Sequence, residues 1–125
     1  MLTFGKLKEY IGLKIDTATT INVVGNKIAL DKVYPCVVMK FPTCIPEEAK
    51  EDWILELDFW DKEADNDVDS TDILTAVELV KAAMNRSWQV ETGGFFKSYL
   101  EFEGEIPDDT VGVYHFNQRY QITMY

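Results

Sequence analysis

Residues 53–72 read WILELDFWDKEADNDVDSTD, and this stretch decides the fold that the sequence predicts. Up to Trp60 one face of the stretch is wholly apolar and the other includes two acidic residues, which is the period of a half-buried strand. One face carries the residues expected in the core: Trp53, Leu55, Leu57 and Phe59. The other carries Ile54, Glu56, Asp58 and Trp60. The alternation indicates an antiparallel sheet with one side on the core and the other on water or a partner.

Beyond the acidic stretch, at Ser70, the pattern changes to the helical period. Ile73, Val77, Val80 and Met84 are spaced by four, three and four residues, which predicts an amphipathic helix over 70–86. We expect Asp69 or Ser70 to cap its start. Asp72 in the first turn and Arg86 at the end suit the helix dipole.

The N-terminal third predicts a helix, a hairpin and a strand. Residues 3–15 form the expected helix, with Thr3 as N-cap. Gly25-Asn26 is a two-residue turn signal between two β-branched runs. A strand follows over 33–41, with Pro35 at its start because proline cannot donate to a ladder. Pro42 and Pro46 are expected to bracket a loop.

The C-terminal third predicts two strands. Gly93-Gly94 breaks the chain before a strand that puts Phe96, Leu100 and Phe102 on one face, and 107–109 forms a turn. The last strand alternates Phe116, Tyr120, Ile122 and Met124 with His115, Asn117, Arg119, Gln121 and Thr123. Residues 1–125 are therefore predicted to form a single α+β domain. Its mainly antiparallel sheet of about four to six strands carries two helices packed on it.

The charge is concentrated in one segment. The chain has 125 residues and a net charge of −10, and residues 47–72 alone hold twelve acidic and two basic residues. Nucleic-acid binding requires a basic footprint, so we expect no specific nucleic-acid partner. No apolar run approaches the ~20 residues of a membrane span. The early charges in MLTFGKLKEY also argue against a signal peptide.

The sequence offers no catalytic residue or cofactor site, and we expect no enzyme. His115 is the sole histidine and is expected on the surface or facing a partner. Neither a G-x-S-x-G motif nor a phosphate-binding P-loop is present. Cys36 and Cys44 lack metal-type spacing. A disulfide between them stays open, but we expect thiols.

The loop Asp65-Asn66-Asp67-Val68-Asp69 resembles the start of a calcium loop. The resemblance ends at Ser70 and Ala76, where an EF-hand needs glycine and a bidentate glutamate. The interpretation we favour is a solvated loop whose last acidic residues cap the helix. Glu63, Asp65, Asp67 and Asp69 are the candidates for an acidic surface that faces a partner.

Arg119 is a lone cation in a strand of neutral polar residues. We expect it to pair across strands with Glu101 or Glu103. The alternative is an ion pair with another subunit.

Together these patterns resemble a known family. YPCVVMKFP before one strand, LELDFWDK ending the next, an acidic loop into an amphipathic helix and a closing ITMY are similar to phage tail terminator proteins. These are also called tail completion or minor tail proteins of long-tailed phages and prophages. The hydrophobic-Asp-hydrophobic-Trp-(Asp/Asn) pattern of that family is matched by residues 57–61. The resemblance covers about residues 33–125.

The resemblance implies a structural role in the virion tail, assembled in the host cytoplasm. Tail terminators form a homo-hexameric ring that ends the tail tube and joins it to the head connector, while DNA passes through unbound. An acidic segment near such a conduit would repel phosphates. The alternative is a small acidic monomeric binding or inhibitor protein that engages a basic partner through 47–72. A third hypothesis is an enzyme or metal-binding protein.

Replacing Asp65, Asp67 and Asp69 together by Asn tests whether the acidic loop is solvated. Because exposed substitutions shift stability by only about 0.5 kcal/mol, we expect the melting temperature to stay within a few degrees. Thermal unfolding followed by circular dichroism measures this. A large fall would show that the loop is buried or structural.

Overall fold

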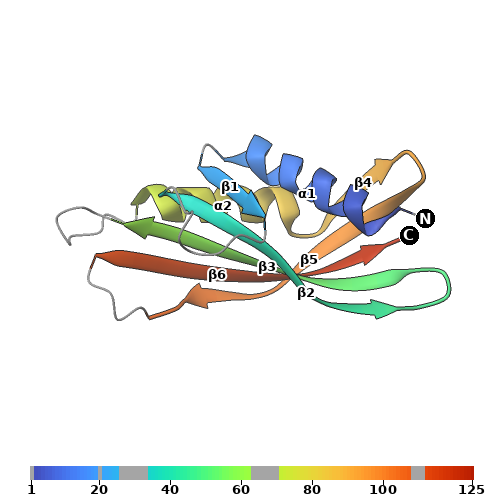
Figure 1. The fold of residues 1–125 in the computed structure, drawn as a ribbon. Coiled ribbons are helices and arrows are strands. Elements are labelled where there is room, and N and C mark those ends of the chain that lie inside the picture. Colours follow the sequence, from blue (N-terminus) through green and yellow to red (C-terminus); the bar gives the residue numbers. More distant parts are fainter. Residues whose placement is uncertain (1, 20, 26–33, 63–70, 108–111) are drawn as a thin grey trace.

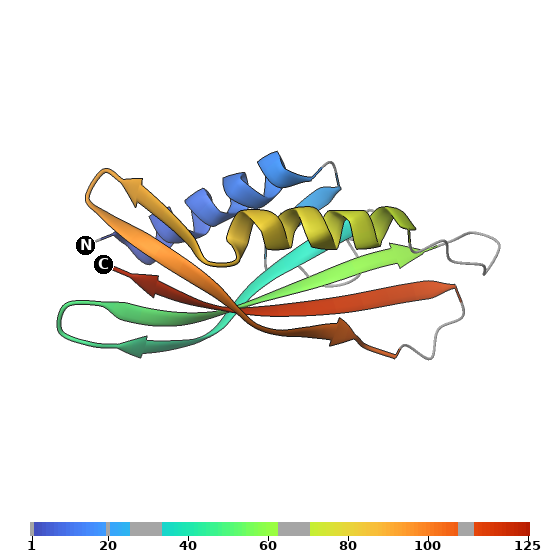
Figure 2. The ribbon, with the colours of Figure 1, turned by 180° about the vertical axis from the view of Figure 1, so that it is seen from behind.

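The computed structural model describes residues 2–19, 21–25, 34–62, 71–107 and 112–125. In chain order the elements are α1 (Phe4–Ala18), β1 (Asn22–Gly25), β2 (Cys36–Pro46), β3 (Glu51–Lys62), α2 (Thr71–Met84), β4 (Ser87–Glu91), β5 (Gly94–Glu105) and β6 (Val113–Met124). Both helices lie on the same face of one twisted sheet (Figures 1 and 2). This confirms the predicted α+β fold.

The sheet is built around β3 and β6. Its strand order is β1-β2-β3-β6-β5-β4. All neighbours pair antiparallel except β1, which runs parallel to β2. The hairpin expected at Gly25-Asn26 stays a prediction, because residues 26–33 lie outside the described residues; the described β1 pairs with β2. β4 was not predicted at all.

The two helices confirm the predicted periodicity. Thr3 caps α1, since its hydroxyl accepts a hydrogen bond from the backbone N–H of Lys6 at 3.2 Å. The helix continues three residues beyond the expected end, to Ala18. The side chains that point at the sheet are fully buried: Leu7, Ile11 and Ile15 of α1 and Ile73, Val80 and Met84 of α2. The predicted caps Asp69 and Ser70 of α2 lie outside the described residues.

The core lies between the helices and one face of the sheet. It contains the predicted alternating residues of the central strands, all fully buried: Leu55, Leu57 and Phe59 from β3 and Tyr120, Ile122 and Met124 from β6. Trp53 sits at the rim, where its ring stacks on Phe4 with centroids 4.1 Å apart. The assignment of core and outer faces from the sequence is thus confirmed for β3 and for most of β6.

Gln118 is the exception in β6, and the sequence analysis passed over it. Its side chain is fully buried on the core face. It donates to the carbonyl of Val77 at 3.3 Å and to Oε2 of Glu103 at 3.0 Å, and it accepts from the Tyr120 hydroxyl at 2.8 Å. A buried amide is tolerated here because it is hydrogen-bonded.

Two irregular positions overturn sequence predictions. β2 does not end at Phe41 but continues to Pro46, and Pro42 falls where the register shifts between Lys40 and Thr43. A bulge removes the need for a donor at that position. A second shift in β5, between Leu100 and Phe102, places Phe102 opposite Arg119. Phe102 is 52% exposed whereas Phe96 is buried, so the prediction that they share one face of the strand is wrong.

Replacing Leu57 by Ala should lower the free energy of unfolding by about 2–5 kcal/mol, because a fully buried leucine leaves a cavity in the central strand. Val80→Ala removes fewer atoms and should fall near the bottom of that range. Urea denaturation of both variants measures the losses. A loss below about 1 kcal/mol for Leu57→Ala would contradict its place in the core.

Candidate functional site

The acidic residues proposed as a lumen or partner surface cannot be placed. Glu63, Asp65, Asp67 and Asp69 lie outside the residues that the structure describes, so this surface stays a prediction. In the described part of the chain, no group of three or more His, Cys, Asp or Glu residues is arranged to hold a metal ion. None of the described helices is long and apolar enough to cross a bilayer.

The two cysteines are thiols, as the sequence analysis expected. Cys36 is buried at the start of β2, and Cys44 is partly exposed near the end of the same strand. Burial raises the pKa of the Cys44 thiol, and the negative charges of Glu51 and Asp52 raise it further. A raised pKa keeps the thiol protonated and unreactive.

Arg119 does not make the expected ion pair with Glu101 or Glu103. Its guanidinium carbon lies 5.4 Å from the centre of the Phe102 ring, in a cation–π contact on the outer face of the sheet. Glu103 instead contacts Lys81, with 2.6 Å between Nζ and Oε1. Within the described residues Arg119 has no ion pair, and its Nε is buried without a hydrogen-bond partner. Contact with another subunit stays a prediction.

His115 lies on the outer face of the sheet but is more buried than the surface position that the sequence suggested, and a contact with a partner stays a prediction. Its side chain is 11% exposed, and its Nε2 lies 2.7 Å from Oδ1 of Asp58. The imidazole also stacks on Trp60, with centroids 3.7 Å apart. Trp60 and His115 are register partners in β3 and β6, and Asp58 is two residues along on the same face. Knowing the register would have revealed this pair.

Asp58 is the centre of this outer-face cluster. Besides His115 it accepts from Asn117 Nδ2 at 3.0 Å, and Lys40 Nζ lies 3.0 Å from Oδ2. Burial raises the pKa of Asp58, but hydrogen bonds from His115, Asn117 and Lys40 and the charge of Lys40 outweigh it and lower the pKa to about 2. The carboxylate therefore ties together β2, β3 and β6.

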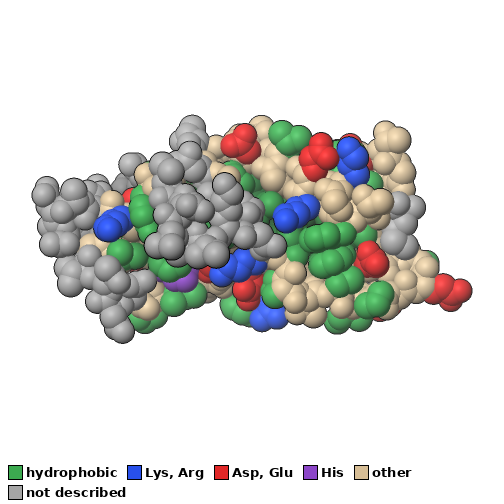
Figure 3. All heavy atoms as spheres, viewed as in Figure 1, with side chains coloured by type: hydrophobic (Ala, Val, Ile, Leu, Met, Phe, Trp, Pro, Cys, Tyr) green, Lys and Arg blue, Asp and Glu red, His purple; other side chains and the backbone are tan. Residues whose placement is uncertain are grey.

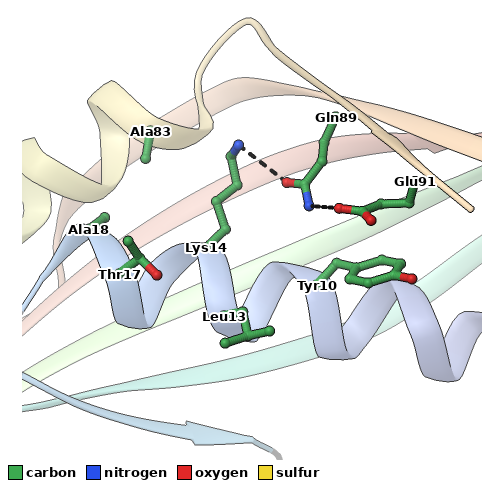
Figure 4. A pocket seen from close by; sticks show the side chains of 8 residues that line it. All are labelled: Tyr10, Leu13, Lys14, Thr17, Ala18, Ala83, Gln89 and Glu91. Carbon is green, nitrogen blue, oxygen red and sulfur yellow. Dashed lines mark hydrogen bonds between the residues drawn. The ribbon is translucent and has the colours of Figure 1, made fainter.

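A cleft opens on the helical side, between α1, the end of α2 and β4 (Figure 4). Its volume is about 600 Å³. Lys14 extends from α1 towards β4 and donates to Gln89 at 3.4 Å, and Gln89 donates to Glu91 at 2.6 Å. The neutral amide of Gln89 thus lies between the ammonium of Lys14 and the carboxylate of Glu91 on the wall of the cleft.

The outer face of β4 and β5, on the other side of the sheet from that cleft, carries strongly exposed apolar side chains. Trp88 is 64% and Val90 79% exposed, although both lie in a strand. The ring of Phe95 stacks on Trp88 at 5.6 Å and on Tyr125 at 4.4 Å. We call this surface the aromatic–lysine patch, formed by Trp88, Val90, Phe95, Lys97, Tyr99 and Tyr125.

Lys97 lies at the centre of the patch. Its ammonium is 5.7 Å from the ring of Trp88, 6.0 Å from that of Tyr99 and 5.7 Å from that of Tyr125. Exposed aromatic side chains are enriched at protein interfaces, whereas lysine is depleted there, so the rings rather than the cation give this patch the character of an interface. The patch is therefore the described surface best suited to bind another protein.

Comparisons with known proteins leave the family open. A scan against protein-family models finds no match. A search of curated proteins finds no match either.

The Asp58 cluster predicts a specific pH dependence of stability. A pKa lowered to about 2 in the folded state favours folding above the ordinary value of 3.8, and this contribution disappears as the pH falls towards 2. Between pH 5 and pH 2, the native protein should lose about 2 kcal/mol more stability than Asp58→Asn. Urea denaturation across this range measures the difference.

Glu48→Gln is the matched control, because Glu48 is exposed in the turn between β2 and β3. It should keep the acid dependence of the native protein. If Asp58→Asn followed the native curve in parallel, the carboxylate would not be stabilised by its neighbours.

Proposed function

We propose that this protein is a tail terminator of a long-tailed phage or prophage. In this role it forms a homo-hexameric ring that ends the tail tube and presents a surface to the head connector. Its partners are copies of itself, the tail tube protein and the connector protein. It acts in the virion tail, after assembly in the host cytoplasm, and catalyses no reaction.

The observation that carries the proposal is the combination of the predicted fold with an exposed binding patch. The strand–loop–helix order on which the resemblance rests is present as β3 followed by α2. The aromatic–lysine patch lies on the sheet face that neither helix covers. A small protein with helices on one face and an aromatic patch on the other is well suited to assembly.

The charge distribution also favours a structural role beside DNA. The net charge is −10. A ring of such chains would repel phosphates, so that DNA could pass without adhering. The side chains that would line the bore are those of Glu63, Asp65, Asp67 and Asp69.

Native mass spectrometry across a concentration series tests the ring. We expect a closed species of roughly six times the 14.4 kDa of one chain, with few intermediates, because a heterologous contact closes when its rotation permits. The same measurement in the presence of purified tail tubes tests whether the ring assembles only on a tail tube.

A chain that stays monomeric in both conditions would contradict the proposal. That outcome would favour a monomeric acidic protein that engages a basic partner through 47–72. A tail tube gene beside the gene for this chain would argue independently for the tail.

A further inference from the structure

Two hairpins of opposite character flank the end of β6. Met124 in β6 pairs with Glu51 of β3 on one side and with Phe96 of β5 on the other. The β2–β3 hairpin and the β4–β5 hairpin therefore leave the sheet at the same end. Figure 1 shows them diverging on either side of the C-terminus. Since β6 separates them, the two hairpins of one chain are held apart.

The turn of the β2–β3 hairpin carries the exposed carboxylates of Glu47 and Glu48, and the ammonium of Lys50 lies 3.8 Å from the carboxylate of Glu47. We call residues 45–49 the acidic tip: Ile45, Pro46, Glu47, Glu48 and Ala49, all of which are exposed. Ile45 has 54% of its surface in water despite lying in a strand. Figure 3 shows acidic side chains at the end of this hairpin and hydrophobic ones nearer the body.

The β4–β5 hairpin presents the complementary chemistry. The aromatic–lysine patch offers exposed rings for an apolar group such as Ile45, and it contains no acidic residue. None of its side chains is a carboxylate, and the ammonium of Lys97 lies among the surrounding rings. Carboxylates of the acidic tip could pair with this ammonium while the rings cover the apolar part of the tip.

We infer that the acidic tip of one copy docks on the aromatic–lysine patch of a second copy. The inference rests on the proposed ring and names the contact that builds it. At a net charge of −10 two copies repel each other over most orientations. Contact between the acidic tip of one copy and the aromatic–lysine patch of another opposes this repulsion, because it brings opposite charges together. Tip and patch are different surfaces, so the contact is head-to-tail and can propagate around a ring.

Disulfide trapping between copies tests the contact directly. In a Cys44→Ser background, Ala49→Cys and Val90→Cys chains are mixed and mildly oxidised, and mass spectrometry identifies the linkage. We expect a 49–90 crosslink between copies. The matched control replaces Ala49→Cys by Ala82→Cys, which puts an equally exposed cysteine on α2. A 49–90 yield no higher than the 82–90 yield would overturn the inference.

Charge reversal then tests the chemistry of the contact. Lys97→Glu places like charges together and should lower the 49–90 yield by at least about tenfold. Lys6→Glu makes the same change of charge on exposed α1 and should leave the yield unaltered. Adding Glu47→Lys and Glu48→Lys to Lys97→Glu should restore it. Equal losses for Lys97→Glu and Lys6→Glu, or no restoration, would overturn the assigned pairing.

The outcome separates this inference from the proposed function. A closed ring in native mass spectrometry without the 49–90 crosslink would refute the contact and leave the ring standing. The crosslink without a closed species would support the contact and refute the ring. Monomers without the crosslink would refute both.

Discussion

The antiparallel pairing of β3 with β6 is the constraint on which the rest of the structure depends. The two strands are in register along their full length, from Glu51 opposite Met124 to Lys62 opposite Val113. Because side chains alternate with period two, this register puts Leu57 and Tyr120 on the face that the helices cover. A slip by one residue would expose that core and bury the charged cluster around Asp58. The same register brings Asp58 within hydrogen-bond distance of His115 and Asn117, so one pairing determines both faces of the sheet.

The flanking strands follow this alternation only until a bulge interrupts it. In β5 the shift after Leu100 turns Phe102 to the outer face, where it meets Arg119, and puts Glu103 beside the buried Gln118. In β2 the shift after Lys40 accommodates Pro42 and lets the strand continue into the acidic tip. Bulges redirect side chains that a regular strand would hide or expose. The bulge in β5 thus explains why Phe102 is exposed, and the bulge in β2 explains why that strand continues to Pro46.

These features explain what the sequence could and could not predict. Both helices and the core faces of β3 and β6 were predictable, because their periodicity is long and uninterrupted. Phe102 and Pro42 were misplaced because a one-residue register shift leaves no mark in the hydrophobic pattern. β4 was missed because it has only five residues and its apolar side chains, Trp88 and Val90, point to solvent rather than to the core. The polar contacts of His115 and Gln118 depend on which strand pairs with which. That order, with β6 between β3 and β5, is set by packing of the whole chain and not by local sequence.

The missed strand changes how the charge of the chain should be understood. Counted along the sequence, the acidic segment 47–72 dominates and suggests a protein that repels its neighbours. In the folded chain the beginning of that segment is the tip of the β2–β3 hairpin. On the other side of β6, the β4–β5 hairpin presents aromatic rings gathered around Lys97. The acidic tip and the aromatic–lysine patch carry opposite charges on two separate hairpins. Two copies can therefore attract each other when tip meets patch, and they repel each other in other orientations. Repulsion then contributes to specificity, because wrongly oriented copies separate. A head-to-tail contact of this kind favours a closed ring over a two-fold dimer, in which each surface must match itself.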